Sequence, residues 1–304
     1  MPSSGLWQMS DKSGEERETV GDALEESEIP QPPSDHLEDE EPHPLGQEAP
    51  EIIHDAAQIG GKRLHRPLFE SSITGLIGGM SVCFGAVALA WGSASAGANT
   101  NLGHLLGALA FPVGFIILLV GKSELFTENF FLPVTAVLER EGSLRELGRL
   151  WGSTLVFNLV GVLVFALLIS RDGVLDPGPA VVLRELAEKK IDFSLSTAFI
   201  KAIFAGWLMT LLTWLLIAAE GFSSKLLLIW IMGALIVLGQ FNHVIISAAE
   251  IWIAILLDAD VTIPQWFFRN FLPALFGNLL GGVVFVTLFH YVQALTQVRA
   301  ANGR

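Results

Sequence analysis

Two short polar stretches interrupt long apolar segments of this sequence, and they carry the side chains best suited to chemistry. They read Leu125-Phe126-Thr127-Glu128-Asn129 and Phe241-Asn242-His243-Val244. Polar and ionisable groups are costly at membrane depth, so they usually line a pathway for a solute. Two interrupted segments in corresponding parts of a chain are typical of a transport site. We therefore interpret the two stretches as two sides of one pathway.

His243 and Thr127 are the leading candidates for direct contact with a solute. His243 is the only histidine deep inside an apolar segment, and no charged residue occurs among the 24 residues from Leu226 to Ala249. An imidazole changes protonation near physiological pH, so it could attract an anion or exchange a proton with a weak acid. The Thr127 hydroxyl could donate to that anion or to His243. The simpler alternatives are a core histidine and a threonine that caps a half-helix.

The helix ends created by such interruptions should also favour an anion, because their N-terminal dipoles point positive ends at the gap. Four aromatic side chains could form apolar constrictions beside the gap, although each alone is more often ordinary packing: Phe111, Phe115, Phe126 and Phe241. No second histidine or cysteine is placed to complete a zinc site, so no metal or cofactor is expected. Ser247 follows His243 by four residues, but no orienting group for nucleophilic catalysis is evident, and no enzyme activity is expected.

Glu128 conflicts with a path for anions. An ionised carboxylate beside the pore would repel an anion by several kcal/mol at short range, even at an effective dielectric constant of about 20. Glu128 could pair with His243 or Lys201, carry a proton, or face away from the pore. Lys201 could instead extend along its helix to the membrane interface.

The elements that must position these residues are apolar helices. Of the 304 residues, 51% are hydrophobic and 16% are charged, which is not the composition of an ordinary soluble domain. Six segments are long enough to cross a hydrocarbon layer of about 30 Å as helices: 73–91, 102–138, 150–169, 198–219, 226–257 and 271–295. The second and fifth are too long for one crossing and are interrupted near 121–129 and 239–245, as helices broken around a buried loop would be. A surface helix is expected at 180–191.

The chain is predicted to have three parts. Residues 1–62 form a disordered acidic cytoplasmic tail, residues 63–298 the six-helix membrane domain, and residues 299–304 a short cytoplasmic C-terminus. Sixteen of the 31 acidic residues lie before residue 60, so the net charge of −13 belongs mainly to the tail. Such a segment buries too little apolar surface to offset the entropy of ordering. A short amphipathic helix within Ala49–Ile59 is the alternative for its last part.

The two halves of the membrane domain resemble each other. Asn158-Leu159-Val160-Gly161 matches Asn278-Leu279-Leu280-Gly281 at an offset of 120 residues. Gly79 matches Gly206 at an offset of 127, and Thr127 matches Asn242 at 115, each after a phenylalanine. Because three spans are repeated as three, the second copy should enter the membrane inverted.

Basic residues predict the orientation of the chain. They precede the first span and follow the second, fourth and sixth spans, whereas the loop at 92–101 has none. Since cytoplasmic loops carry an excess of lysine and arginine, both termini are predicted to lie in the cytoplasm. The loop after the third span opposes this, because it carries Arg171, Arg184, Lys189 and Lys190.

Taken in order, these motifs resemble the formate/nitrite transporter family. The resemblance covers about residues 66–295 and rests on both interruptions, on the Asn158 to Gly161 motif and on the segment from Phe271 to Gly282. It implies an all-α membrane protein, a homopentamer of aquaporin-like six-helix protomers in which helices 2 and 5 are broken. It also implies passage of small monovalent weak-acid anions such as formate or nitrite.

The resemblance assigns roles to individual residues of this chain. Thr127 and His243 become the central polar pair, and Phe111 falls where members carry a constriction phenylalanine. The chain also departs from the family pattern. Glu128 stands where members usually have a small residue, and Asn242 replaces the usual glutamate before the histidine. Val244 and Ser247 replace a serine and an asparagine, as in a divergent branch typified by the inner-membrane protein YfdC.

We therefore predict a channel or proton-linked transporter for small monovalent weak-acid anions, embedded in a lipid bilayer. Nothing in the charge pattern suggests a nucleic-acid partner. Two alternatives remain open. Glu128 makes a channel of the same fold for neutral solutes or cations credible, and the acidic tail allows a non-transporting membrane scaffold or sensor.

Overall fold

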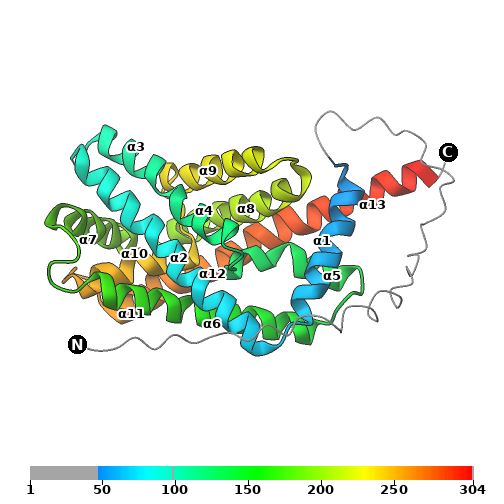
Figure 1. Cartoon of the computed structure of the whole chain (residues 1–304), viewed down its shortest axis with the longest axis horizontal. Coiled ribbons are helices and arrows are strands. Elements are labelled where there is room, and N and C mark those ends of the chain that lie inside the picture. The colour runs from blue at the N-terminus through cyan, green and yellow to red at the C-terminus, as the bar shows by residue number, and fades with distance from the viewer. Residues whose placement is uncertain (1–46, 98, 303–304) are drawn as a thin grey trace, which may run out of the picture. The chain divides into compact units, whose positions relative to one another are not determined.

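The computed structural model describes residues 47–97 and 99–302, and these residues form helices joined by loops, with no strand among them (Figure 1). The first half consists of α1 (Ala49–Leu64), α2 (Leu68–Ser95), α3 (Asn101–Ala110), α4 (Pro112–Val120), the 3-10 helix η1 (Phe126–Phe130), α5 (Leu132–Leu138) and α6 (Leu144–Ile169). The predicted all-helical class is confirmed.

The second half follows with helices of similar character. It consists of α7 (Pro177–Asp192), α8 (Leu195–Ala218), α9 (Phe222–Leu238), α10 (Val244–Leu256), α11 (Ile263–Gln265), the π-helix η2 (Trp266–Phe271), α12 (Leu272–Leu279), the π-helix η3 (Leu280–Leu288) and α13 (Phe289–Asn302). Five helical runs of the described chain are long and apolar enough to cross a membrane: Leu68–Ser95, Asn101–Val120, Leu144–Ile169, Leu195–Ala218 and Ile263–Asn302.

Helix α1 overlaps the segment predicted to be a disordered tail. Residues 49–62 are helical, so the prediction of disorder is wrong for this part, and the helix extends beyond the alternative at Ala49–Ile59. Its apolar side, which includes Ile52 and Ala56, packs on α5 and α13. This burial depends on distant segments, which explains why local composition underestimates the order. Residues 1–46 of the predicted tail lie outside the described part.

Two pairs of long helices pack closely along each other. Helix α2 packs along α6, and α8 packs along α12 and η3. Gly79 on α2 and Gly206 on α8 make this possible, because a Cβ atom at either position would collide with the backbone carbonyl of Asn158 or Asn278. Gly161 and Gly281 meet the backbones of α2 and α8 in the same way. Small residues thus bring two helix backbones into direct contact in each half.

Asn158 on α6 holds the loop between α4 and η1. Its Oδ1 accepts the N–H of Phe126 at 2.8 Å, and its Nδ2 donates to the carbonyls of Glu124 at 2.9 Å and Gly75 at 2.7 Å. The Phe126 N–H and the Glu124 carbonyl belong to chain that has left the helical hydrogen-bonding pattern, whereas the Gly75 carbonyl lies within α2. In an apolar bundle the first two need other partners, and the single carboxamide of Asn158 supplies them.

Asn278 on α12 does the same for the loop between α9 and α10. Its Oδ1 accepts the N–H of Val244 at 2.8 Å, and its Nδ2 donates to the carbonyls of Ala202 at 2.8 Å and Asn242 at 3.0 Å. The carboxamide therefore contacts one backbone N–H and two carbonyls, as the other asparagine does. Both are fully buried.

These matched bonds correct the alignment of the two interruptions. Phe126 corresponds to Val244, at an offset of 118 residues, so Leu125 rather than Thr127 corresponds to the position of His243. The predicted match of Thr127 with Asn242 at an offset of 115 is wrong. It relied on a phenylalanine that precedes both residues, whereas the backbone groups bound by the asparagines define the equivalence.

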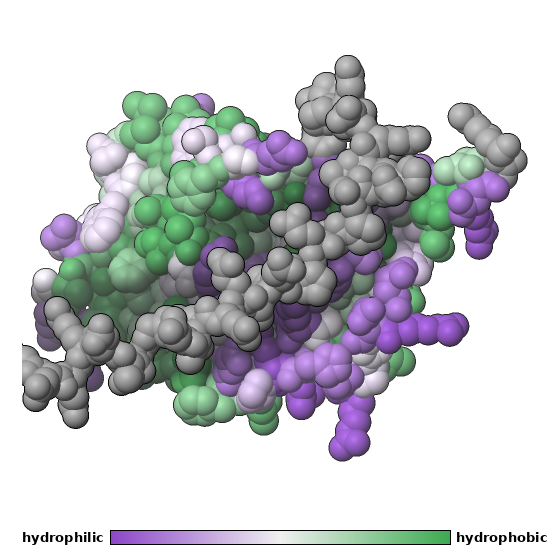
Figure 2. Space-filling view, turned by 45° about the vertical axis from the view of Figure 1, so that its right-hand side comes forward, coloured by the Kyte–Doolittle hydropathy of each residue, from purple (hydrophilic) through white to green (hydrophobic). Residues whose placement is uncertain are grey.

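Large apolar side chains cover much of the outer surface, as expected for contact with lipid or with other subunits. In Figure 2 hydrophobic side chains form a broad area on the left of the face shown, and hydrophilic ones gather toward its lower right. The exposed large apolar side chains of the whole described surface include Val156, Leu168, Ile200, Phe204, Leu227 and Phe276. A soluble monomer seldom exposes so much contiguous apolar surface.

The paired asparagines give the first testable prediction. Asn278→Leu leaves the N–H of Val244 and the carbonyl of Asn242 without partners. Each such loss costs about 1–3 kcal/mol. We expect a loss of roughly 3 kcal/mol or more in the free energy of unfolding, with a similar loss for Asn158→Leu. The measurement is denaturant unfolding of the purified protein in detergent, followed by tryptophan fluorescence.

The control is Asn101→Leu, which makes the same change at an exposed position on α3. Its unfolding midpoint should stay near that of the unaltered protein. An equal midpoint for Asn278→Leu and Asn101→Leu would contradict the structural role of the carboxamide.

Candidate functional site

Thr127 and His243 meet where the two interrupted segments approach each other. The Thr127 Oγ1 lies 2.8 Å from the His243 Nε2, and both residues are fully buried. Thr127 belongs to η1, and His243 is the residue that immediately precedes α10. The two side chains, which are 116 residues apart in the chain, thus form one hydrogen-bonded pair inside the bundle.

The other ring nitrogen of His243 caps helix α10. Nδ1 accepts the backbone N–H groups of Ile245 at 3.3 Å and Ile246 at 3.2 Å. A nitrogen that accepts hydrogen bonds carries no proton, so in the neutral ring the proton is on Nε2. Nε2–H therefore donates to the Thr127 Oγ1, and the hydroxyl hydrogen of Thr127 remains available for another acceptor.

The first N–H groups of α10 are all bound by the chain itself. Asn278 takes that of Val244, the His243 ring takes the next two, and the His243 carbonyl takes that of Ser247. An anion near this helix N-terminus would therefore meet no free backbone N–H group in the first turn of α10. The free donor at the junction is the hydroxyl of Thr127, while the helix N-terminus stabilises the histidine.

Asn242 belongs to a buried polar network. Its Oδ1 accepts from the Ser247 Oγ at 2.7 Å and from the Asn270 Nδ2 at 3.0 Å. Its Nδ2 lies 3.4 Å from the carbonyl of Ala198. These contacts tie the loop before α10 to α8 and η2. Asn242 therefore positions the loop that carries His243.

The predicted constriction residues occupy different surroundings. Phe111 and Phe115 are fully buried and pack edge to face with ring centroids 5.2 Å apart, between α2, α4 and α9. Phe126 packs against Phe130 at 4.8 Å, next to the central pair, and Leu125 is fully buried before it. Phe241 stacks on Phe204 of α8, with ring centroids 5.4 Å apart, and it lines the cavity between α7, α9 and α10. All four of Phe111, Phe115, Leu125 and Phe126 belong to one buried apolar cluster, and Leu125 and Phe126 directly precede Thr127 in the chain.

Glu128 lies in η1 beside Thr127 and is only 3% exposed. Among the described residues its Oε1 has no hydrogen-bond partner, and neither His243 nor Lys201 forms an ion pair with it. Lys201 instead donates to the carbonyl of Gly239 at 3.1 Å. Arg63 is bound to Asn129, the residue after Glu128, so its positive charge lies near this carboxylate. Both pairings expected from the sequence are therefore absent from the described part.

Two arginines near the end of α1 reach the first interruption. Arg63 Nη1 donates to the Asn129 Oδ1 at 3.0 Å, and its Nε lies 3.3 Å from the Glu124 Oε1. Arg66 Nη1 binds the same oxygen of Glu124. The indole of Trp151 donates to the Asn129 carbonyl at 2.8 Å. The amphipathic helix is thus joined to the loop beside Glu128 by charged groups.

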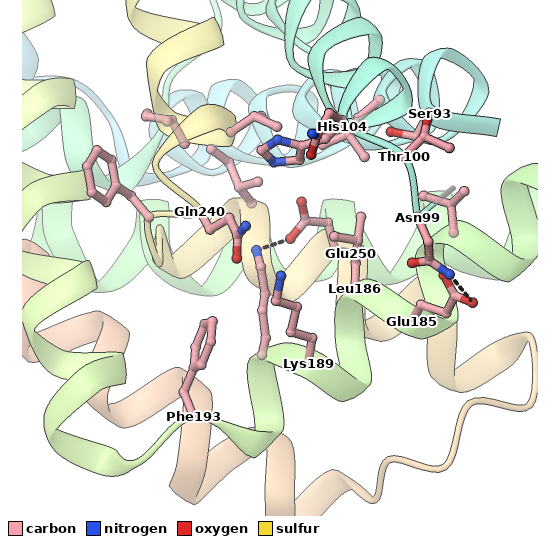
Figure 3. A pocket seen from close by; sticks show the side chains of 18 residues that line it. Ser93, Asn99, Thr100, His104, Glu185, Leu186, Lys189, Phe193, Gln240 and Glu250 are labelled. Carbon is pink, nitrogen blue, oxygen red and sulfur yellow. Dashed lines mark hydrogen bonds and ion pairs between the residues drawn. The ribbon is translucent and has the colours of Figure 1, made fainter. Parts of the chain in front are cut away.

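A cavity of about 340 Å³ opens between α2, α3, α7, α9 and α10 (Figure 3). Its polar wall includes Ser93, His104, Lys189, Lys190, Gln240 and Glu250. Phe241 and Ile246, which flank His243 in the chain, also line it. The cavity therefore approaches the central pair. In the described chain no three His, Cys, Asp or Glu residues lie close enough to hold a metal ion.

Sequence reasoning missed four polar contributors to this region: Arg63, Lys190, Glu250 and Asn270. A usable signal existed for Glu250, because it is the first charge after the apolar run and follows His243 by seven residues. Residues seven apart share a helix face. No local signal marked Arg63, Lys190 or Asn270, since their partners lie far away in the chain.

Sequence comparison places this architecture among known transporters. The formate/nitrite transporter family profile matches residues 50–292. The chain is 32% identical over 253 residues to the uncharacterized transporter YrhG of Bacillus subtilis, covering 80% of this chain and 91% of that protein. It is 30% identical over 251 residues to a probable formate transporter of Methanothermobacter thermautotrophicus, covering 76% and 91%. The inner membrane protein YfdC of Escherichia coli is 27% identical over 205 residues, covering 66% and 65%.

Solved structures share the fold. An FNT family ion channel superposes with a TM-score of 0.74 at 21% sequence identity, covering 80% of this chain and 98% of that one. A pentameric formate channel with formate bound superposes with a TM-score of 0.64 at 21% identity, covering 75% and 98%. Together with the family match over most of its length, this shows that the chain belongs to the formate/nitrite transporter family, whose members are membrane transporters.

Proposed function

We propose that this protein is a membrane channel or transporter for small monovalent weak-acid anions such as formate or nitrite. The observation that carries the proposal is the buried contact between Thr127 and His243 at the junction of the two interruptions. Ionisable groups inside a membrane bundle usually mark a solute pathway. The probable formate transporter and the formate-bound channel named above support the same class of solute.

The geometry suggests how the pair acts on an anion. Nε2–H of His243 fixes the Thr127 oxygen, so the hydroxyl hydrogen is directed away from the ring and can be donated to the solute. The surrounding side chains of Leu125 and Phe126 are apolar and exclude a hydrated ion. An anion that sheds its water thus meets one oriented donor in a medium where hydrogen bonds are strong.

Proton linkage would involve the second ring nitrogen. Nδ1 already accepts two backbone N–H groups, so a proton placed there would face two donors. Proton transfer through His243 therefore requires the start of α10 to release these bonds. We propose that any proton-linked step is coupled to movement of the loop that precedes α10.

We propose six membrane spans, arranged as two inverted sets of three, with spans 2 and 5 broken. Helices α9 and α10 have 17 and 13 residues, each fewer than the roughly 20 that a single crossing needs, which supports one broken span. Both termini are proposed to be cytoplasmic. Two of the three basic residues of α7 that opposed this orientation are bound within the protein, since Lys190 pairs with Glu250 and Arg184 donates to the Leu257 carbonyl.

The proposed assembly is a homopentamer in the inner (plasma) membrane, in which each protomer has its own pore. The formate-bound neighbour is described as pentameric, and the exposed aromatic residues offer surface for contacts between subunits. Phe204 stacks on Trp207 at 6.5 Å, and Trp207 stacks on Phe285 at 5.3 Å. This outward cluster of rings would suit a helix of a neighbouring protomer or lipid.

A second candidate function is passage of a cation or a neutral solute. It is favoured by the unpartnered Oε1 of Glu128, which lies one residue from the central threonine. A charged Glu128 would attract cations and repel anions. Arg63 opposes this effect, because its positive charge acts on the same carboxylate.

Conservative substitutions at the central pair test the leading proposal. Thr127→Val keeps the shape but removes the hydroxyl, and a hydrogen bond to a charged group is worth about 1.5–3 kcal/mol. We therefore expect the rate of formate uptake in proteoliposomes to fall roughly 10- to 100-fold. Thr127→Ser retains the donor and should keep most of the uptake.

His243→Asn is the matching test on the other side of the pair. Asparagine is a good helix cap, so α10 keeps an acceptor while the donor to Thr127 is lost. We expect reduced uptake from a protein that still folds. Unchanged uptake of formate and nitrite in both Thr127→Val and His243→Asn would contradict the assignment of these residues.

Glu128→Gln separates the two candidate functions, since it removes the charge at nearly constant shape. If anions pass, the substitution should leave formate uptake equal or raise it several-fold, because a repulsive charge is lost. If cations pass, cation current should fall. Ion-replacement currents in planar bilayers make the distinction, with swelling of vesicles in glycerol as the assay for neutral solutes.

A further inference from the structure

A buried ion pair lies in the wall of the cavity that approaches His243. Lys190 of α7 pairs with Glu250 of α10, and their side chains are only 10% and 4% exposed. Figure 3 draws this pair as the dashed line at Glu250, close to Gln240 and Lys189. Lys190 also donates to the Ser247 Oγ at 3.1 Å. The pair joins α7 to α10, two helices that line the cavity, and His243 immediately precedes α10.

Hydrogen bonds connect this pair to the loop before α10. The Ser247 Oγ accepts from Lys190 and donates to the Asn242 Oδ1 at 2.7 Å. Asn242 immediately precedes His243. His243, Ser247 and Glu250 recur at intervals of four and three residues, so they share one face of α10. The charge on α7 is therefore connected through the Ser247 hydroxyl to Asn242, the residue next to the central histidine.

Lys190 needs a negative partner at this depth, because a buried ammonium without a counter-charge is strongly unfavourable. Asn242 lies one hydroxyl away but is neutral. Glu185 lies in the same cavity, but it is exposed and its carboxylate meets the Asn99 amide instead, at 3.4 Å. In the described part of the chain, Glu250 is the carboxylate that pairs with Lys190.

We infer that Glu250 is a positioning residue for ion passage, because it neutralises Lys190 and keeps that lysine bound to the Ser247–Asn242 link. This inference rests on the proposed function in one respect, namely that the cavity is an entry path for the anion. While the pair is intact, the cavity wall holds no free buried cation. An anion therefore passes toward Thr127 without being trapped on Lys190.

Loss of the Glu250 charge should convert the cavity wall into an anion-binding site. Lys190 would then present an unpaired ammonium to a space of about 340 Å³. Adding Asn242→Glu should remove this anion-binding site, because the new carboxylate can pair with Lys190. The glutamate side chain would be one methylene longer than that of asparagine, which would let it reach past the Ser247 hydroxyl toward Lys190.

The test compares four variants of the full chain with the unaltered protein. Glu250→Gln removes the counter-charge, and Asn242→Glu combined with Glu250→Gln supplies another. Lys190→Met combined with Glu250→Met removes both charges. Glu185→Gln is the matched control, because it removes a carboxylate from the same cavity without touching the pair.

The first measurement does not depend on transport. The unfolding temperature in detergent is compared in sodium formate, sodium chloride and sodium gluconate at equal ionic strength. We expect formate and chloride to raise that of Glu250→Gln by on the order of 3 °C, since a ligand that binds only the folded state stabilises it. The other three variants and the unaltered protein should show no such rise.

The second measurement is formate uptake in proteoliposomes as a function of concentration. For Glu250→Gln we expect the half-saturating concentration to fall about tenfold together with the maximal rate, as for a solute held too tightly. Asn242→Glu with Glu250→Gln should restore both values. A residue that only stabilised the fold would not give this opposite change in affinity and rate, nor its rescue.

Two results would overturn the inference. One is a folded Glu250→Gln protein with no anion-dependent rise in unfolding temperature. The other is a rise that persists after Asn242→Glu is added. If Glu250→Gln does not fold, recovery of folding by Asn242→Glu supports the inference and failure to recover contradicts it. An absence of formate uptake by the unaltered protein would instead refute the proposed function, and the unfolding measurement would still decide the role of Glu250.

Discussion

The structure depends on satisfying backbone hydrogen-bonding groups where helices are interrupted inside an apolar bundle. Asn158 and Asn278 meet this need in the same way, each binding one N–H and two carbonyls. Neither carboxamide could reach both the interruption and the neighbouring helix unless backbones came very close. Gly79 and Gly206 allow that approach, because a Cβ there would strike the asparagine backbone. The interruptions and the tight helix pairs are therefore parts of one arrangement.

The same constraint defines the chemistry at the centre. Once Asn278 and the His243 ring have taken the N–H groups at the start of α10, that helix end has no donor left for a solute. The contacts also determine which ring nitrogen of His243 carries the proton. Thr127 thereby becomes the residue with a hydrogen to offer. The sequence suggests that a helix dipole holds the anion. The structure instead offers the oriented hydroxyl of Thr127, surrounded by apolar side chains.

The sequence predicted the main features that depend on local pattern. The apolar segments, both interruptions and the two residues that meet at the centre follow from periodicity, from the cost of polar groups in an apolar run and from the family resemblance. Helix α1 was placed in a disordered tail, because its stability comes from packing on α5 and α13 rather than from its own composition. The alignment of the interruptions also failed, since a repeated phenylalanine is a weaker guide than the backbone groups that the asparagines bind.

Pairing of charges was the least predictable part. Glu128 was expected to meet His243 or Lys201, but the nearby positive charge is that of Arg63, which binds the adjacent Asn129. The partner of Lys190 lies 60 residues away on another helix. Such pairs depend on how helices pack, and the sequence of one helix does not indicate which side chains of another helix will lie opposite it. Glu250 was recoverable only through its seven-residue spacing from His243, which places it on the same face of α10.

The proton position on His243 is the most direct test of this account. Nitrogen-15 solid-state NMR of the protein in lipid bilayers at neutral pH distinguishes protonated from bare ring nitrogens, and a His243→Asn sample identifies the signals of this residue. The contacts predict a protonated Nε2 and a bare Nδ1. A proton on Nδ1, alone or together with one on Nε2, would contradict the arrangement in which the ring caps α10 and orients the Thr127 hydroxyl.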